Sequence, residues 1–202
     1  MGSFVYSQCD VGEVEIWDLC YSIEETTILQ NTDDTFGDFP IAICDLVNLE
    51  ILDLDVMFGS TNSITGEIPE CIGALINLTY LNLGWNELYG YIPESIGNLS
   101  NLTYLSVLSN QLTGEIPETI GNLTNLEELN LGFNAFYGEI PESIGNLTQL
   151  TDLYFSFNQL TGDIPQTIGN LSNLTMLSIV NNQFTGEIPE TIGNLVNLVS
   201  FN

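Results

Sequence analysis

Carboxylates are the side chains of this sequence best suited to chemistry, because the chain has 27 Asp and Glu but no Lys, Arg or His. Glu127, Glu128 and Asp152 lie close together on adjacent predicted strands. Paired carboxylates hydrolyse glycosides. A repeat this rich in acids also brings such pairs together by chance, and without His or Lys neither an ordinary triad nor a Schiff base can form. The sequence therefore predicts that the protein is not an enzyme.

The composition excludes further classes of function. A formal net charge of −27 without one cation offers nothing to neutralise nucleic acid phosphates, and anionic membrane surfaces would repel it. No apolar run reaches about 18 residues, so no transmembrane helix is predicted. The start, MGSFVYSQCD, lacks the basic and apolar regions of a signal peptide. Since 44% of the residues are hydrophobic, the chain can still build a sizeable core.

A sequence repeat positions these carboxylates. GEIPETIGNLT begins at Gly114 and GEIPESIGNLT at Gly138. Counted from this glycine as place one, units recur at one constant interval, beginning at Gly66, Gly90, Gly114, Gly138, Gly162 and Gly186. An earlier unit begins at Gly37 and is longer than the others because of an insertion at residues 56–60. All seven prolines occupy place four. One unit cannot bury its apolar side alone, so the pattern predicts a solenoid of stacked coils.

The apolar spacing predicts the elements of each coil. In the unit from Gly114, Leu129 and Leu131 are two residues apart, the period of a strand. Ile120 and Leu123 are three apart, which suits one side of a short 3₁₀ turn. Asn134 follows the strand, and we expect its side chain to hydrogen-bond the backbone of its own coil and of a neighbouring coil.

The segment LEELNLGFNAFYGEIP, residues 126–141, fits the pattern LxxLxLxxNxLxGxIP and resembles the plant-type leucine-rich repeat. The resemblance covers about residues 23–202. It implies a right-handed repeat solenoid with a parallel β-sheet on the concave side, a second short strand near LxGxIP, and 3₁₀ or irregular convex segments. Receptor-like kinase ectodomains, polygalacturonase inhibitors, plant antifreeze proteins and secreted microbial proteins share this repeat, so the fold alone does not identify a ligand.

The expected organisation is an N-terminal cap, residues 1–36, followed by a solenoid, residues 37–202, of six full repeats and a truncated seventh. The resemblance implies that Cys9 and Cys20 pair within the cap. Cys44 and Cys71 occupy places eight and six of consecutive units, and coils about 4.8 Å apart make a bridge plausible. Other pairings and four free thiols remain open, but disulfides and hence an extracellular compartment are favoured.

The concave strands carry the predicted binding face. Two ladders of outward-facing residues cross the coils. The first ladder reads Ile51, Tyr80, Tyr104, Glu128, Asp152, Met176, and the second reads Asp53, Asn82, Ser106, Asn130, Tyr154, Ser178. Exposed aromatic residues among polar ones are typical of binding surfaces. The predicted ligand-binding residues are Tyr80, Tyr104, Glu128, Asp152, Tyr154, Trp85, Asn82 and Asn130. Trp85, Phe133 and Phe157 have an alternative role, covering the edge of the core at the bend.

Acidic residues form ladders elsewhere in the coils. Place five carries Glu70, Glu94, Glu118, Glu142 and Glu190, interrupted by Gln166. Place two carries Asp38, Glu67, Glu115, Glu139, Asp163 and Glu187, interrupted by Tyr91. Like charges about 5 Å apart in water repel by roughly 0.8 kcal/mol before screening. The ladders are therefore possible weak sites for Ca²⁺ or another cation, or a dock for a cationic protein, unless they only form a solvated face. Nothing resembles an EF-hand loop, and no cofactor is expected.

Together these features predict a non-enzymatic binding module that recognises a protein or a glycan through its concave face, outside the cell or at its surface. One alternative is a structural protein that self-associates through its uncapped C-terminal coil, with cations bridging acidic faces. A second is an engineered or selected protein without basic residues and without a specific ligand. Regular Thr, Ser and Asn arrays on the coil flanks also permit ice binding.

Overall fold

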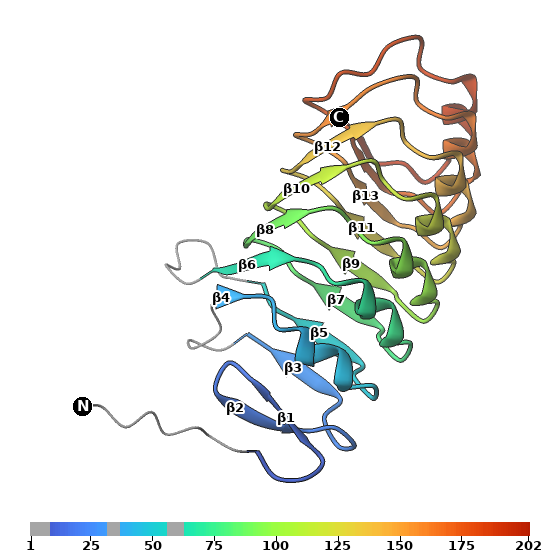
Figure 1. Cartoon of the computed structure of the whole chain (residues 1–202). Helices are drawn as coiled ribbons and strands as arrows, with labels where there is room; N and C mark the ends of the chain where they lie inside the picture. Colours follow the sequence, from blue (N-terminus) through green and yellow to red (C-terminus); the bar gives the residue numbers. More distant parts are fainter. Residues whose placement is uncertain (1–8, 32–36, 56–62) are drawn as a thin grey trace.

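The computed structural model describes residues 9–31, 37–55 and 63–202. The predicted insertion at residues 56–60 lies outside this part of the chain. The described chain winds as a solenoid, with strands on two of its sides and short 3₁₀ helices stacked along a third (Figure 1). The repeat solenoid expected from the regular spacing of the units is confirmed.

The concave sheet is parallel, and its strands pair in the order β16-β15-β13-β11-β9-β7-β5-β3. Their bounds are β3 (Ile28–Gln30), β5 (Ile51–Asp53), β7 (Tyr80–Asn82), β9 (Tyr104–Ser106), β11 (Glu128–Asn130), β13 (Asp152–Tyr154), β15 (Met176–Ser178) and β16 (Ser200–Phe201). Glu128 pairs with Asp152, and Leu129 with Leu153. Equivalent places of the repeat therefore stand opposite each other, as predicted, and the central Leu of β11 and β13 points into the core.

A second parallel sheet lies on the flank, in the order β14-β12-β10-β8-β6-β4. Its strands are β4 (Gly37–Asp38), β6 (Ile64–Glu67), β8 (Glu87–Gly90), β10 (Gln111–Gly114), β12 (Ala135–Gly138) and β14 (Gln159–Leu160). Here Gln111 pairs with Tyr89 rather than with Glu87, which holds the equivalent place of the repeat. Gln159 likewise pairs with Tyr137 rather than with Ala135. Neighbouring strands are thus offset by two residues relative to the concave sheet.

Short 3₁₀ helices form the convex segments, each starting directly after the place-four proline. They are η1 (Ile41–Asp45), η2 (Glu70–Ala74), η3 (Glu94–Asn98), η4 (Glu118–Asn122), η5 (Glu142–Asn146), η6 (Gln166–Asn170) and η7 (Glu190–Asn194). Ile120, Leu123 and Leu126 are fully buried, as are Leu129 and Leu131 of the strand region. One continuous hydrophobic core therefore runs through the stacked coils.

The asparagine after each concave strand holds the bend. The Asn134 side-chain nitrogen donates to the Val107 carbonyl of the preceding coil (2.9 Å) and to the Leu131 and Gly132 carbonyls of its own coil. Its Oδ1 accepts from the Leu112 N–H (3.0 Å). The expected double role, toward its own coil and a neighbouring one, is confirmed. Equivalent contacts recur at Asn86, Asn110, Asn158 and Asn182.

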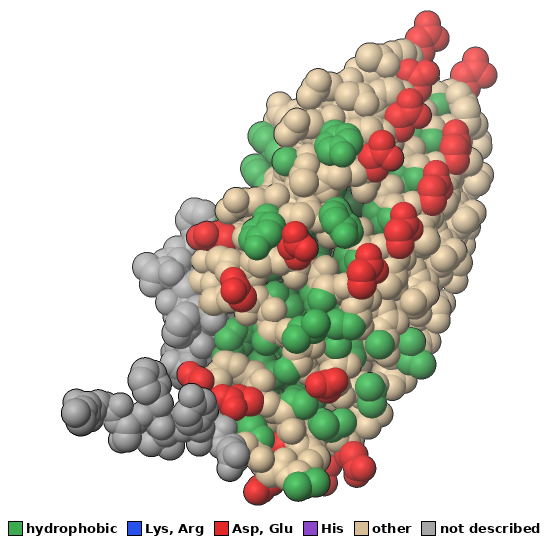
Figure 2. Space-filling view, viewed as in Figure 1, with side chains coloured by type: hydrophobic (Ala, Val, Ile, Leu, Met, Phe, Trp, Pro, Cys, Tyr) green, Lys and Arg blue, Asp and Glu red, His purple; other side chains and the backbone are tan. Residues whose placement is uncertain are grey.

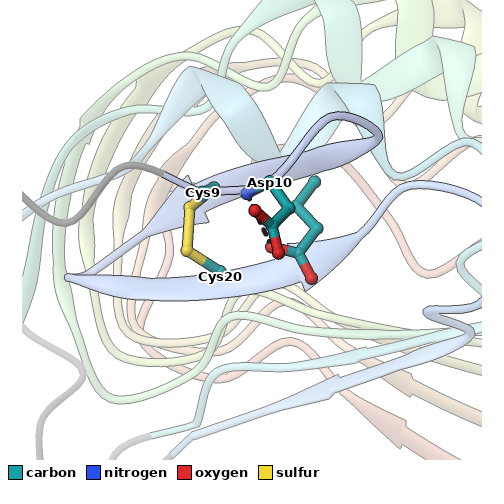
Figure 3. The surroundings of a disulfide bond; sticks show 4 residues. Cys9, Asp10 and Cys20 are labelled. Carbon is teal, nitrogen blue, oxygen red and sulfur yellow. Dashed lines mark hydrogen bonds between the residues drawn. A yellow bond between two sulfur atoms is a disulfide. The ribbon is translucent and has the colours of Figure 1, made fainter.

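An antiparallel hairpin, β1 (Glu13–Ile16) and β2 (Leu19–Ser22), precedes the strands of the concave sheet in the part of the predicted cap that the structure describes. The Cys9–Cys20 disulfide fastens the chain before β1 to β2, and beside it the Asp10 N–H donates to the Glu13 carboxylate at 3.0 Å (Figure 3). A second disulfide, Cys44–Cys71, joins η1 to η2. Both predicted pairings are confirmed.

Candidate ligand-binding face

The first concave ladder begins with apolar and aromatic side chains. The paired strands place Ile28 beside Ile51, Ile51 beside Tyr80, and Tyr80 beside Tyr104. Ile28 is 51% exposed, and Ile51 and the two tyrosines are half-buried. The tyrosine rings stack with centroids 4.3 Å apart and planes 10° apart. Four consecutive coils therefore present one apolar strip, which begins one coil earlier than the ladder predicted from the sequence.

The same ladder becomes acidic at the next two coils. Glu128 follows Tyr104, and Asp152 stands opposite Glu128. Burial raises the pKa of the Glu128 carboxyl, and the Asp152 carboxylate raises it further. The Asp152 charge thus disfavours the charged form of Glu128, and the chain has no Lys, Arg or His side chain to offset it. A positively charged group placed between them would be stabilised.

Tyr154 of the second ladder is hydrogen-bonded to Asp152 of the first. Its hydroxyl donates to Asp152 Oδ1 at 3.2 Å, and the Thr151 hydroxyl donates to Asp152 Oδ2 at 2.7 Å. Burial, and then the Asp152 charge, raises the pKa of Tyr154 to about 12. The tyrosine therefore stays neutral at physiological pH and fixes the orientation of the carboxylate.

Two members of the second ladder are less accessible than expected. Asn82 is only 6% exposed and Ser106 only 2%. The Asn82 Oδ1 accepts from the Gly84 N–H at 3.1 Å, and Asn130 makes the same contact with Gly132 at 3.2 Å. Asn82 is thus a structural residue of the strand exit rather than an open ligand contact, whereas Asn130 stays half-buried. The N-x-G spacing that both asparagines share could have indicated this local hydrogen bond from the sequence.

Aromatic residues line the exit of the concave strands. Trp85, Phe133 and Phe157 are 40%, 50% and 43% exposed, and the two phenylalanine rings stack 4.1 Å apart. All three have positive φ angles, between 54° and 58°. Bulky residues rarely adopt this conformation. Backbone hydrogen bonds to the next coil hold it, such as Phe133 N–H to the Ser156 carbonyl (2.9 Å). These side chains form an accessible rim beside the concave face.

Asp55 is a residue that sequence analysis missed. It occupies the place of Gly84, Gly132 and Ser156 in later coils. Its Oδ1 is buried without a hydrogen-bond partner, and its Oδ2 accepts weakly from the Asn82 amide at 3.4 Å. Burial raises the pKa of this carboxyl, the Asn82 hydrogen bond lowers it, and the Asp53 charge raises it. The N-terminal end of the concave face is therefore acidic as well.

Metal ligands do not converge on the predicted ladder. Within the described part of the chain, the group that brings three potential ligand atoms within 4.8 Å of one another is Cys9, Glu13 and Cys20. Its two sulfurs are joined in a disulfide and cannot act as thiolates. The carboxylates of Glu70, Glu94, Glu118 and Glu142 form no such group, so weak cation binding there remains a prediction.

The geometry defines a repeat solenoid with one parallel sheet on its concave side and a second on its flank. The chain matches the family model described as "Leucine-rich repeat region" over residues 93–202, and that described as "Leucine Rich Repeat" over residues 77–99. The first match covers more than half of the chain, so the protein belongs to the leucine-rich-repeat family. A comparison with curated protein sequences finds no match.

Solved structures show the same fold. The plant peptide hormone receptor RGFR1, in complex with RGF2, is 40% identical with a TM-score of 0.77, over 81% of this chain and 26% of that chain. The ectodomain of the Arabidopsis receptor kinase HAESA, in complex with an extended IDA peptide hormone, is 31% identical with a TM-score of 0.70, over 93% and 31%. A plant ice-binding protein is 28% identical with a TM-score of 0.63, over 96% and 74%.

This chain therefore spans between about a quarter and a third of those two receptor chains. In residues 9–31, 37–55 and 63–202, no helix has the length and apolar character needed to cross a membrane.

Proposed function

We propose that this protein is a non-enzymatic binding module that works outside the cell and receives a peptide segment of a protein ligand on its concave face. The observation that best supports this proposal is the change of chemistry along the first concave ladder. The ladder is apolar or aromatic at Ile28, Ile51, Tyr80 and Tyr104 and acidic at Glu128 and Asp152. Two disulfides support an oxidising compartment. Two of the similar solved structures hold peptide hormones.

The order of this ladder defines the ligand. Apolar side chains of the peptide pack over the stacked Tyr80 and Tyr104 rings, which offer rigid contact area at small entropic cost. A Lys or Arg of the peptide then reaches Glu128 and Asp152, where it relieves the repulsion between the two carboxylates. On this ladder the apolar and the acidic side chains occupy different coils, so the two ends of the peptide meet different chemistry.

Selection from a displayed library of random peptides tests the proposal. We expect the selected peptides to share an apolar or aromatic stretch next to a basic residue. Tyr104→Ala and Glu128→Gln should each weaken binding of a selected peptide by about tenfold, since such contacts contribute roughly 1–2 kcal/mol. Tyr137→Ala, which removes an exposed tyrosine of the flank, should leave binding unchanged.

Thermal melts of the three variants confirm that each is folded. Failure to select any peptide, or equal binding by all three variants, would overturn the proposal. Selective binding to a glycan array that depends on Tyr104 would replace the peptide by a carbohydrate ligand.

Ice binding is a second candidate function, supported by an exposed row of hydroxyls. Ser100, Thr124, Thr148 and Ser172 occupy one place in consecutive coils and are all exposed. A plant ice-binding protein is among the similar structures. Thermal hysteresis that disappears in a Thr124→Val, Thr148→Val double variant would support this function, and its absence in the native protein would exclude it.

A further inference from the structure

A groove on the flank of the solenoid is separate from the concave face. It has a volume of about 870 Å³ and is lined by residues of consecutive coils. Ile116, Ile140 and Ile164 and the prolines that follow them are among its lining residues, and Ile116 and Ile140 are only 4% and 3% exposed. Carboxylates line much of the rest, namely Glu94, Glu115, Glu118, Glu139, Glu142 and Asp163. Figure 2 shows two rows of acidic side chains along the solenoid with hydrophobic side chains between them.

The place-two acids lie close to the glycine that begins the next coil. A Cβ atom added at Gly138 would lie 2.9 Å from Cγ of Glu115, and one added at Gly162 would lie 2.6 Å from Cγ of Glu139. The stems of these exposed acids therefore lie over the glycine of the next coil. Both glycines have positive φ angles, 80° and 71°. The positive φ angles favour glycine at both positions, and the acids of this row follow the spacing of the coils.

The two acidic rows overlap over a limited length of the solenoid axis. At place two, Tyr91 interrupts the acids before Glu115, and at place five Gln166 interrupts them after Glu142. The groove begins beyond Tyr91 and reaches Gln166, which lines it. Within the groove, both rows are acidic in the two coils that begin at Gly114 and Gly138, and each row extends by one further coil, to Glu94 in one direction and to Asp163 in the other.

We propose that this acidic groove binds a basic, extended segment of a partner polypeptide, with a Lys or Arg at every third residue. Charge complementarity identifies the partner, because the chain has no Lys, Arg or His side chain to neutralise the groove. A second copy of this chain is excluded as the occupant for the same reason, and nucleic acid carries the same sign of charge.

The periodicity follows from two repeat lengths. Neighbouring coils are about 4.8 Å apart, so every second coil is about 9.6 Å away. A polyproline II segment has three residues per turn and rises about 3.1 Å per residue, hence about 9.3 Å per turn. One face of such a segment therefore meets every second carboxylate in register. Side chains on one face of a β-strand repeat at about 6.7 Å and lose register with the coils.

Fluorescence anisotropy with labelled synthetic peptides tests this inference. The probe is a peptide of repeated Lys-Pro-Pro triplets, and the comparison peptide has the same composition with its lysines clustered at one end. At an ionic strength of about 0.15 M, where long-range attraction is screened, we expect the triplet peptide to bind at least about threefold more tightly. Equal binding of both peptides would overturn the proposal.

Two variants with the same net charge locate the site. Glu94→Gln, Glu139→Gln, Glu142→Gln removes three of the six groove carboxylates, of which Glu94 and Glu142 lie two coils apart in one row. Glu15→Gln, Glu24→Gln, Glu25→Gln removes three exposed acids near the N-terminus. Loss of three exposed ion pairs should weaken binding of the triplet peptide by about tenfold in the groove variant. The cap variant should bind within about twofold of the native protein, because its acids lie outside the groove.

An equal loss of affinity for the triplet peptide in both variants would show that binding is only general charge attraction. That result would overturn the proposed binding site. Tyr104→Ala should leave binding of the triplet peptide unchanged, so that failure here is distinguishable from failure of the concave binding face.

Discussion

The first coil junction and the later ones solve the same packing problem with different chemistry. At each junction, place eight of one coil comes close to place six of the next. Between η1 and η2 these places are Cys44 and Cys71, whose Cα atoms are 5.8 Å apart and whose sulfurs are bonded. Between η4 and η5 they are Gly121 and Ser143, and a Cβ added at Gly121 would lie 2.5 Å from the Ser143 carbonyl oxygen.

A hydrogen bond at the later junctions takes the place of the disulfide. The Ser143 hydroxyl donates to the Glu118 carbonyl of the preceding coil at 2.8 Å. Equivalent bonds are donated by Ser95, Thr119, Thr167 and Thr191. Where the repeat is regular, glycine allows a close approach and a hydroxyl completes it. Where the first unit is longer than the regular repeat, a covalent bond fastens the junction instead.

Loss of the first junction should have the largest effect. Replacing Cys44 and Cys71 by serine removes a disulfide between residues 27 apart in sequence. From the entropy that such a crosslink removes from the unfolded chain, we expect the free energy of unfolding to fall by about 3–4 kcal/mol. Since stability in a solenoid is carried by neighbouring coils, the loss should concentrate near the first coil. Hydrogen exchange should show lost protection in β5 and retained protection in β13.

The Cys9→Ser, Cys20→Ser variant is the control, because that disulfide lies in the cap hairpin outside the stacked 3₁₀ helices. It should leave β5 better protected than the first variant does. Equal loss of protection in β5 and β13 would show that the junction does not act locally.

Gly121→Ala tests the later kind of junction and should have an intermediate effect. The added methyl group meets backbone and Cβ atoms of Ser143 that cannot move independently of the coil. Overpacking of this kind costs about 1–3 kcal/mol. The matched control is Gly193→Ala, at the same place in the last coil, where a Cβ would meet nothing within 4 Å. Denaturant melts should show a loss for Gly121→Ala, and equal stability of the two variants would contradict the close-approach explanation.

The sequence predicts the framework of this protein better than its surface. Leucine spacing, the prolines and the asparagines fix the coil because each acts within one repeat or between equivalent places. The Cys44–Cys71 pair was predictable for the same reason. The burial of Asn82, the positive φ angle of Phe133 and the offset register of the second sheet were not, because they depend on how adjacent coils pack.

Asp55→Asn should have the smallest effect on stability. It tests one place of the repeat at which the first coil carries a charge and later coils carry uncharged residues. The raised pKa of Asp55 means that the folded protein binds this proton more tightly than the unfolded chain. That contribution to stability is complete below the ordinary value of 3.8 and is lost as pH rises through the folded-state pKa. At neutral pH the charged, partly buried carboxylate therefore destabilises the fold.

The amide variant should gain about 0.5 kcal/mol at neutral pH, within the range of substitutions outside the core, and the gain should vanish in acid. Glu127→Gln removes an exposed charge and serves as the control. Thermal melts from neutral to acidic pH measure both. If the two variants follow the same pH dependence, the effect is general charge repulsion in a chain of net charge −27. If only Asp55→Asn changes, the first coil carries a buried charge where later coils carry uncharged residues such as Gly84, and the difference between the two regions extends from the convex junction to the concave sheet.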